Sequence, residues 1–304
     1  MSDVGEVTPP LLPAPASRVL RYAAFTDQGS GGNPAGVLLD ADGVEDRIRL
    51  AVAAQVGYSE TAFVEAQGGR GQYRVRYFSP QAEVAFCGHA TIAAAVAITD
   101  RDGPGLLQFS TLAGPIAVQT SVTSEGVTAT LTSVPTRTRA AQAQELDAAL
   151  AALGWQRSDL DPRYPVHVAY AGNDHLVLAV RKRSLLAALD YDFPTLGAVM
   201  AERVWTTVHL VWAESRTVFH ARDPFPPGGV IEDPATGAAA AAFGGYLRTL
   251  GLVELPTRIT ILQGADMGRP SRLLVDLSPD DDRVRVTGTA APIPAGRTPY
   301  SQPR

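Results

Sequence analysis

The stretch Phe86-Cys87-Gly88-His89-Ala90-Thr91 leads directly into the alanine-rich segment 92–98, and it decides how this chain folds. A second stretch, Glu232-Asp233-Pro234-Ala235-Thr236-Gly237, leads in the same way into the alanine-rich segment 238–243. Each stretch starts with a side chain that can carry a proton or act as a nucleophile and then turns through small residues. Asp233 follows Cys87 by 146 residues, which is close to half of the 304-residue chain. The repeat predicts two similar domains that face a shared cleft.

Both alanine-rich segments are predicted to be helices whose N-termini point into that cleft. A helix N-terminus has unpaired N–H groups and about half a positive charge, so it attracts an anion. Two such N-termini facing each other favour the binding of a small carboxylate. Alanine-rich helices are also thin, which suits a helix that is enclosed by sheet on several sides.

The composition is that of a globular chain long enough for two domains. Hydrophobic residues make up 45% and charged residues 19% of the sequence, and the net charge of −5 provides no basic patch for nucleic acid. A single cysteine excludes an intrachain disulfide and a cysteine-rich zinc site, and no metal enzyme is expected from so few histidines. We expect a soluble cytoplasmic protein without a membrane partner, because no apolar stretch approaches the roughly 20 residues of a membrane helix and no signal-peptide pattern is visible.

The pattern of strands and helices divides the chain into four parts. A flexible N-terminal arm is predicted for residues 1–17, two domains for residues 18–134 and 135–290, and a C-terminal tail for residues 291–304. The boundary between the domains is placed at residues 133–137, where strand character stops and a helical segment is expected to begin. The predicted helices cover residues 46–56, 93–98, 145–153, 184–189, 192–200 and 238–250. The predicted strands cover residues 18–25, 37–39, 59–65, 73–78, 107–109, 116–120, 127–131, 167–170, 175–180, 208–212, 216–220, 258–263, 271–277 and 283–288.

Two titratable residues of the first half are candidates for proton transfer. Glu60 is flanked by strand-forming residues, and it is either a solvent-facing strand carboxylate or a general acid/base whose pKa burial would raise toward neutrality. His89 lies in a Gly-His turn before a helix, and it either caps the turn or carries a proton at the cleft. Position in the sequence alone does not decide between these roles.

Cys87 and Asp233 also allow a structural and a functional interpretation. Cys87 is either a small buried side chain or a base whose pKa is lowered by the helix N-terminus. Asp233 either caps the helix that follows or contributes a carboxylate to the cleft. Thr236 and Gly237 would offer backbone N–H groups at a point that a ligand can approach closely.

Further short motifs accompany these residues in a fixed order over roughly residues 18–290. They are Gly32-Asn33-Pro34, Ser59-Glu60-Thr61, Phe78-Ser79-Pro80, the segment 83–91, Arg222, the segment 232–237, Gln263-Gly264 and Gly268-Arg269-Pro270-Ser271. The ordered set resembles the PhzF-like (phenazine biosynthesis) isomerase family, which has the diaminopimelate epimerase-like fold.

The resemblance implies an α+β fold with two pseudo-symmetric domains, each a bent sheet or barrel around a central helix. It also implies a cofactor-independent isomerase that acts on a small carboxylate-bearing metabolite and forms a homodimer. The family's catalytic glutamate corresponds to Glu60, which would remove a proton from one carbon and return it elsewhere in the same conjugated system. His89 and Asp233 correspond to its supporting polar residues. The positions implied for substrate binding are Asn33, Ser59, Cys87, Gly88, Ala90, Thr236, Gly237 and Ala238.

Two departures from the family pattern leave other functions open. Ala238 stands where family members often have serine, so the substrate can differ from the phenazine precursor. Related epimerases use two opposed cysteines, whereas this chain has Cys87 and Asp233, which excludes a two-thiol racemase. The alternatives are an epimerase or racemase of an amino or hydroxy acid that uses Cys87 with Asp233, and a ligand-binding or regulatory protein without turnover.

Overall fold

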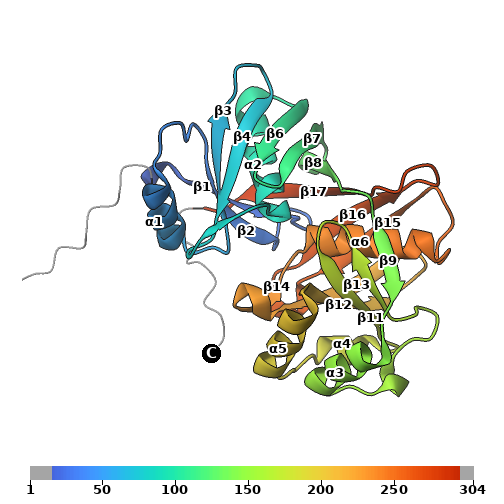
Figure 1. Cartoon of the computed structure of the whole chain (residues 1–304). Helices are drawn as coiled ribbons and strands as arrows, with labels where there is room; N and C mark the ends of the chain where they lie inside the picture. The colour runs from blue at the N-terminus through green and yellow to red at the C-terminus, as the bar shows by residue number, and fades with distance from the viewer. Residues whose placement is uncertain (1–15, 295–304) are drawn as a thin grey trace, which may run out of the picture.

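The computed structural model describes residues 16–294, in which strands and helices form two similar halves (Figure 1). The helices are α1 (Asp46–Val56), α2 (Gly88–Asp102), α3 (Ala143–Leu153), α4 (Arg183–Ala187), α5 (Phe193–Arg203) and α6 (Gly237–Thr249), with short 3-10 helices η1 (Ala16–Arg18), η2 (Arg157–Asp159), η3 (Pro226–Gly228) and η4 (Ala265–Met267). The strands of the first half are β1 (Leu20–Ala24), β2 (Asn33–Leu38), β3 (Thr61–Ala66), β4 (Gln72–Phe78), β5 (Glu83–Val84), β6 (Leu106–Thr111), β7 (Gly114–Thr123) and β8 (Gly126–Thr132). The strands of the second half are β9 (Arg137–Ala140), β10 (His167–Tyr170), β11 (Asp174–Ala179), β12 (Trp205–Ala213), β13 (Val218–Phe225), β14 (Val230–Asp233), β15 (Thr257–Gln263), β16 (Ser271–Leu277) and β17 (Arg285–Pro292).

In the first half, a closed ring of strands surrounds helix α2. The strands follow in the order β1, β2, β3, β4, β6, β7 and β8, with parallel pairing only between β2 and β3 and between β4 and β6. Strand β17 closes the ring because it pairs with both β8 and β1. Every residue of α2 from His89 to Thr99 is buried, which only a helix of small residues inside a barrel allows.

The second half repeats the same pairing pattern around helix α6. The strands follow in the order β10, β11, β12, β13, β15, β16 and β17, with parallel pairing only between β11 and β12 and between β13 and β15. In both halves, a short antiparallel strand (β5 or β14) precedes the central helix. The predicted α+β fold, with two pseudo-symmetric units each built round a central helix, is therefore confirmed.

The two halves are joined through strand β17, which runs from the second half into the first (Figure 1). Its residues 285–287 pair with β16, and its residues 290–292 pair with β1. Strand β9 makes the converse connection, since it follows β8 along the chain and pairs with β10. The domain limits at 134/135 and at 290 stay a prediction, because residues of β17 lie on both sides of the second limit.

Most of the predicted elements are present, and the differences fall near the motifs. The helix predicted for residues 46–56 is α1, with the same bounds. The first alanine-rich helix begins at Gly88, five residues earlier than predicted, because Cys87 is extended and the backbone N–H of Thr91 already donates to its carbonyl. The strand predicted for residues 59–65 begins at Thr61, so Ser59 and Glu60 lie in the turn before β3.

Three short strands were not predicted. Strand β9 lies at residues 137–140, where a helical segment was expected; its sequence Arg-Thr-Arg-Ala is polar and mostly exposed, and backbone pairing with β10 holds it. Strands β5 and β14 are two and four residues long, too short for a periodic pattern. Residues 1–15 of the predicted arm and 295–304 of the predicted tail lie outside the described residues, while residues 16–18 form η1 and residues 291–292 complete β17.

Helix α1 positions the turn that carries Glu60. Its side chains Val52 and Ala53 are fully buried together with Phe63 of β3, and burial of each large apolar side chain contributes about 1.5 to 3 kcal/mol. The helix ends at Gly57, whose positive φ of 72° suits glycine and turns the chain back toward β3. Within residues 16–294, no helix has the length and apolar content needed to cross a bilayer.

Candidate active site

A cleft of about 710 Å³ lies between the two halves, and the first turns of α2 and α6 both line it. The first half contributes the start of β2, the turn 57–60 and residues from 79 to 89. The second half contributes residues 225–230, 232–238 and the side chains of Met267 and Arg269. The two helix N-termini predicted from the sequence therefore open into one cavity.

Ten of the eleven predicted site residues line this cleft. They are Asn33, Ser59, Glu60, Cys87, Gly88, His89, Asp233, Thr236, Gly237 and Ala238. The structure places the side chain of Ala90 elsewhere, fully buried in the core of the first half. Ala90 lies in the first turn of α2, directly after His89.

Glu60, Cys87 and His89 form one compact group on the wall of the first half. The Cys87 thiol donates to Glu60 Oε2 at 3.5 Å, and His89 Nε2 lies 3.3 Å from the same oxygen. Cys87 Sγ lies 3.4 Å from His89 Nδ1, and Ser59 Oγ lies 3.4 Å from His89 Nε2. A carboxyl group that faces a cleft with an imidazole and a thiol beside it is suited to proton transfer.

Asp233 faces this group from the second half and is held by three side chains. Asn33 donates to Asp233 Oδ1 at 2.7 Å, and the Thr236 hydroxyl donates to Oδ2 at 2.6 Å. Gln263 donates to the backbone carbonyl of Asp233 at 2.7 Å and accepts from the backbone N–H of Thr236 at 3.1 Å. The orientation of this carboxyl group is therefore fixed before any ligand arrives.

Burial shifts the proton affinity of all four titratable groups. It raises the pKa of Glu60, although the hydrogen bonds from Ser59 and Cys87 work against it. It raises the pKa of Asp233 to about 6, with the nearby His89 lowering it. Burial lowers the pKa of His89 and raises that of Cys87 well above its usual range. These shifts favour the neutral forms of the His89 imidazole and the Cys87 thiol, and they let the Glu60 and Asp233 carboxyl groups keep a proton to a higher pH than exposed carboxyl groups do.

A buried ion pair behind the site fixes strand β14. Arg222 donates three hydrogen bonds to the Glu232 carboxylate, two from Nε at 3.0 Å and one from Nη2 at 2.5 Å, and it also donates to the carbonyls of Leu186 and Ala187. Strand β14 ends at Asp233, directly after Glu232, so this pair sets the position from which Asp233 enters the cleft. Burying the Glu232 carboxylate or the Arg222 guanidinium without its partner would reduce the stability of the folded protein.

Gly264 allows Gln263 to reach the turn between Asp233 and Thr236. It has a positive φ of 74°, and a Cβ atom there would lie 2.3 Å from the carbonyl oxygen of Arg269 and 2.7 Å from that of Pro234. Only glycine allows so close an approach. The sequence analysis includes the Gln263-Gly264 pair as a motif and assigns it no role, and its glycine is the feature that is consistent with another backbone segment passing close by.

Several other lining residues could not be selected from the sequence. The side chains of Tyr58, Val84, Phe86, Phe225, Val230 and Met267 make one part of the cleft apolar. They come from both halves, and although Val84 and Phe86 lie in the motif 83–91, nothing in the sequence marks these side chains as part of a cleft. Arg269, which lies in a motif of the sequence, adds a positive charge to the lining.

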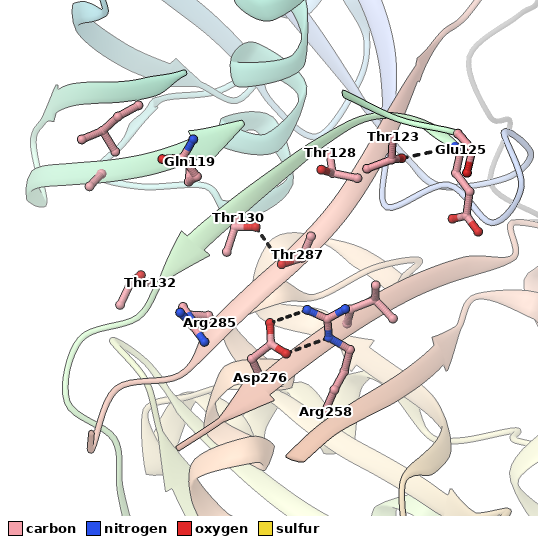
Figure 2. Close-up of a pocket in the computed structure, with 14 residues that line it drawn as sticks. Gln119, Thr123, Glu125, Thr128, Thr130, Thr132, Arg258, Asp276, Arg285 and Thr287 are labelled. Atoms are coloured by element: carbon pink, nitrogen blue, oxygen red, sulfur yellow. Dashed lines mark hydrogen bonds and ion pairs between the residues drawn. The ribbon is translucent and has the colours of Figure 1, made fainter. Parts of the chain in front are cut away.

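A second hollow of about 720 Å³ lies on the outer face of β6, β7, β8, β15, β16 and β17 (Figure 2). Threonine side chains line much of it, and the Thr130 and Thr287 hydroxyls are 2.8 Å apart. Its two carboxylates, Glu125 and Asp276, are both paired with arginine side chains. The interdomain cleft, in which burial raises the pKa of the Glu60 and Asp233 carboxyl groups, is the stronger candidate for chemistry.

The family model described as "phenazine biosynthesis-like protein" matches residues 22–296, which is most of the chain. This chain belongs to the phenazine biosynthesis-like family. The trans-2,3-dihydro-3-hydroxyanthranilate isomerase of Pseudomonas chlororaphis is 29% identical over 270 residues, covering 87% of this chain and 93% of the relative. The chain is thus an isomerase of the phenazine biosynthesis-like family, and the resemblance inferred from its motifs is confirmed.

Solved structures agree with this assignment. A phenazine biosynthesis protein of the PhzF family from Bacillus anthracis superposes with a TM-score of 0.82 at 26% identity, covering 91% of this chain and 96% of that one. A hydroxyproline epimerase from Agrobacterium vitis, solved with bound trans-4-hydroxy-L-proline, superposes with a TM-score of 0.62 at 14% identity, covering 91% and 90% of the two chains. At that identity the epimerase shows a shared fold alone, and the predicted epimerase-like fold of this phenazine biosynthesis-like protein is confirmed.

Proposed function

We propose that this protein moves a proton between two carbons of a small, carboxylate-bearing substrate, with Glu60 as the acid/base and without a cofactor. The observation that carries the proposal is the position of Glu60, whose carboxyl group has a raised pKa and lies in the cleft within 3.3 Å of His89. A carboxyl group with a pKa nearer neutrality both accepts and returns a proton efficiently.

The substrate carboxylate would bind at the helix N-termini. Gly88 begins α2 and Gly237 begins α6, and both line the cleft. A Cβ atom at Gly88 would meet no heavy atom within 4 Å, so the space on this side of the residue is open. The charge of an anion is favoured at either helix end, and Arg269 in the same lining adds to that attraction.

In the proposed step, the C–H bond next to an electron-withdrawing group breaks and its proton passes to the Glu60 carboxylate. The electron pair left on carbon shifts through the conjugated system. The same carboxyl group then protonates a different carbon, so no proton, electron or group is gained or lost overall. Asp233 and His89 would form hydrogen bonds with polar groups of the substrate. They would also donate protons to those groups or accept protons from them.

The relative from Pseudomonas chlororaphis suggests the substrate class. Its name describes an isomerase of trans-2,3-dihydro-3-hydroxyanthranilate, a cyclic amino acid with a conjugated ring. The apolar side chains of Phe86, Phe225 and Met267 would suit a ring of this kind. Ala238, in the first turn of α6, offers no hydroxyl group to the ligand, so a different substituent pattern on the ring is expected here.

Proton NMR in deuterated water tests the proposal. Trans-2,3-dihydro-3-hydroxyanthranilate and a panel of related cyclic carboxylates would be incubated with the enzyme, and the incorporation of deuterium at carbon would be followed. Deuterium at a ring carbon that requires Glu60 supports the proposal. Exchange at the α-carbon that requires Cys87 instead would favour the epimerase. Line broadening that shows binding without exchange would favour the regulatory function.

The assembly and location of the protein stay predictions. A homodimer is expected from the family resemblance, and light scattering coupled to size-exclusion chromatography would measure its mass. A cytoplasmic location is expected from the sequence, and cell fractionation would test it.

A further inference from the structure

A chain of hydrogen bonds lies buried in the second half, next to Asp233. His209 Nδ1 lies 3.0 and 3.1 Å from the two carboxyl oxygens of Asp223, and the Thr207 hydroxyl donates to Asp223 Oδ1 at 3.0 Å. His175 Nδ1 lies 2.8 Å from the Thr207 hydroxyl. These four residues are at most 1% exposed, and none of them lines the cleft. Any part that they play in a reaction therefore acts through another residue.

The strand pairing places Asp223 directly beside Asp233. The two residues are opposite each other in the antiparallel ladder of β13 and β14. The side chains of such a pair point to the same face of the sheet, with Cβ atoms about 4.5 to 5.5 Å apart. Successive side chains of a strand point to opposite faces, so the ion pair of Arg222 and Glu232 lies on the other face. This arginine therefore does not stand between the two aspartates.

The hydrogen bonds indicate where the protons of the buried chain lie. Within residues 16–294, the Nε2 atoms of His175 and His209 are buried and have no hydrogen-bond partner. A proton on either Nε2 would be a buried N–H group without an acceptor, so we place the proton of each neutral ring on Nδ1. Burial also lowers the pKa of His175 to about 3. His175 then donates to Thr207, and both Thr207 and His209 donate to Asp223.

Asp223 and Asp233 differ in how well they can hold a proton. A proton on Asp223 would leave one buried donor of the chain without an acceptor, because its carboxyl oxygens are surrounded by the donors Thr207 and His209. A proton on Asp233 has an acceptor, since the Thr236 hydroxyl can rotate and accept from Oδ2. The ionised form is therefore favoured at Asp223 and the protonated form at Asp233.

We propose that Asp223 is a positioning residue whose buried negative charge keeps a proton on Asp233, so that Asp233 can donate this proton to a polar group of the substrate. Two carboxyl groups that lie side by side in a buried place do not both ionise readily, because their charges repel. Thr207 and His209 hold the Asp223 carboxylate in position and leave its charge in place.

The other titratable groups around Asp233 belong to the cleft. Glu60, His89 and Cys87 face it from the first half. Burial raises the pKa of Asp233 to about 6, His89 lowers it, and Glu60 and Asp223 both raise it. A substrate that enters the cleft would change the surroundings of Glu60 and His89. Asp223 lies outside the cleft, so its effect on Asp233 stays constant through the reaction.

Carbon-13 NMR of protein labelled at the aspartate carboxyl carbons tests the inference. The Asp233 resonance is the one that Asp233→Asn removes, and in the wild type it should titrate near pH 6. Asp223→Asn keeps the size of the side chain and removes its charge, so we expect the titration midpoint of Asp233 to fall by on the order of one pH unit. Asp276→Asn is the matched control, because Asp276 pairs with Arg258 on the outer face and should leave the midpoint unchanged.

A second variant separates the charge of Asp223 from its packing. Thr207→Val has nearly the same shape and removes one hydrogen bond to Asp223 but keeps the charge, so the midpoint of Asp233 should stay near that of the wild type. An unchanged midpoint in Asp223→Asn, or an equal fall in Thr207→Val, would overturn the inference. Circular dichroism would establish that each variant is folded.

The wild type alone decides if a variant does not fold. Nitrogen-15 NMR of histidine-labelled protein, with resonances assigned through the backbone, shows which ring nitrogens carry protons. Near pH 7, His175 and His209 should both be neutral, with the proton on Nδ1. A doubly protonated His209 ring would overturn the inference, because its positive charge would cancel the negative charge of Asp223.

The use of this proton in turnover rests on the proposed function, whereas its presence on Asp233 does not. If the isomerase proposal holds, Asp223→Asn should move the alkaline limb of the kcat/KM profile to lower pH by the same amount as the NMR midpoint. The acidic limb, which belongs to Glu60, should stay in place. Absence of deuterium exchange by the wild type would contradict the proposed function and leave the NMR result unaffected, so either proposal can fail while the other stands.

Discussion

Asn33 of the first half donates a 2.7 Å hydrogen bond to the Asp233 carboxyl group of the second half, across the base of the cleft. The same amide donates to the carbonyl of Ala235 at 3.2 Å, and the Asn33 residue is only 2% exposed. The two residues are 200 positions apart, so this contact links the walls of the site directly. It also fixes one oxygen of Asp233 opposite Glu60 and His89.

Replacing Asn33 with alanine should raise the pKa of Asp233 further and reduce turnover. The carboxylate would keep the side-chain hydrogen bond from Thr236 but lose its other donor, and a lost bond of this kind to a charged group costs about 1.5 to 3 kcal/mol. We expect kcat to fall about tenfold or more and the pH profile of kcat/KM to shift upward. Asn173→Ala, in an exposed turn, is the control. An unchanged rate and pH profile for Asn33→Ala would mean that this hydrogen bond does not set the reactivity of Asp233.

The stability of the protein should depend on pH through Asp233. Its pKa is about 6 in the folded protein and near 3.8 when exposed, so the folded state binds more protons between these values. The free energy of unfolding should therefore fall as pH rises from about 4 to about 6, by at most about 3 kcal/mol. Urea unfolding of wild type and Asp233→Asn across this range measures the effect. The free energy of unfolding of Asp233→Asn should fall less steeply with pH over this range than that of the wild type. An equal fall in both proteins would contradict the raised pKa assigned to Asp233.

Cys87→Ala should retain most of the activity. The thiol has a pKa well above its usual range, so it holds its proton and is a poor base near neutral pH. Its hydrogen bond lowers the pKa of Glu60, so removing it should move the acidic limb of the kcat/KM profile to higher pH. Steady-state kinetics between pH 5 and 9 would show both effects. Complete loss of turnover in a folded Cys87→Ala protein would support the thiol-based epimerase.

The buried Arg222–Glu232 pair should be essential for stability. Removing one partner leaves the other charge buried without a counter-charge, which lowers the free energy of unfolding by about 3 to 5 kcal/mol. We expect Arg222→Ala to lower the free energy of unfolding by this amount, and Arg222→Met with Glu232→Leu together to be less destabilising. The exposed pair Arg216–Glu254 provides the control, because Arg216→Ala should have little effect. If Arg222→Ala and Arg216→Ala lower the free energy of unfolding by the same small amount, strand β14 is held by other contacts.

Local patterns allowed prediction of the core elements and the motif residues. The α1 helix follows from the apolar positions in residues 46–56, and the two alanine-rich helices follow from their composition. Cys87 and Asp233 were paired in the sequence at an interval of 146 residues, but the helix caps are Cys87 and Thr236, 149 residues apart. The turn between Asp233 and Thr236 adds three residues to the second motif, which composition alone does not reveal.

The closure of the first barrel could not be predicted from such patterns. It depends on the pairing of residues 290–292 with residues 22–24, near the two ends of the chain, and β17 has no feature that specifies either partner. The contact between Glu60 and His89 is likewise absent from any local pattern, since the turn before β3 and the start of α2 meet only in the folded barrel. The family resemblance supplied what local physical arguments left open.

Deuterium incorporation by Glu60→Gln tests the central claim most directly. Glutamine keeps the size of the side chain but cannot accept the substrate proton, and Glu254→Gln, whose side chain is 96% exposed, is the control. With a substrate that the wild type exchanges, we expect Glu254→Gln to be unaffected and Glu60→Gln to lose at least about 100-fold of the exchange rate at carbon. Exchange by a folded Glu60→Gln protein at the wild-type rate would contradict the assignment of Glu60 as the acid/base.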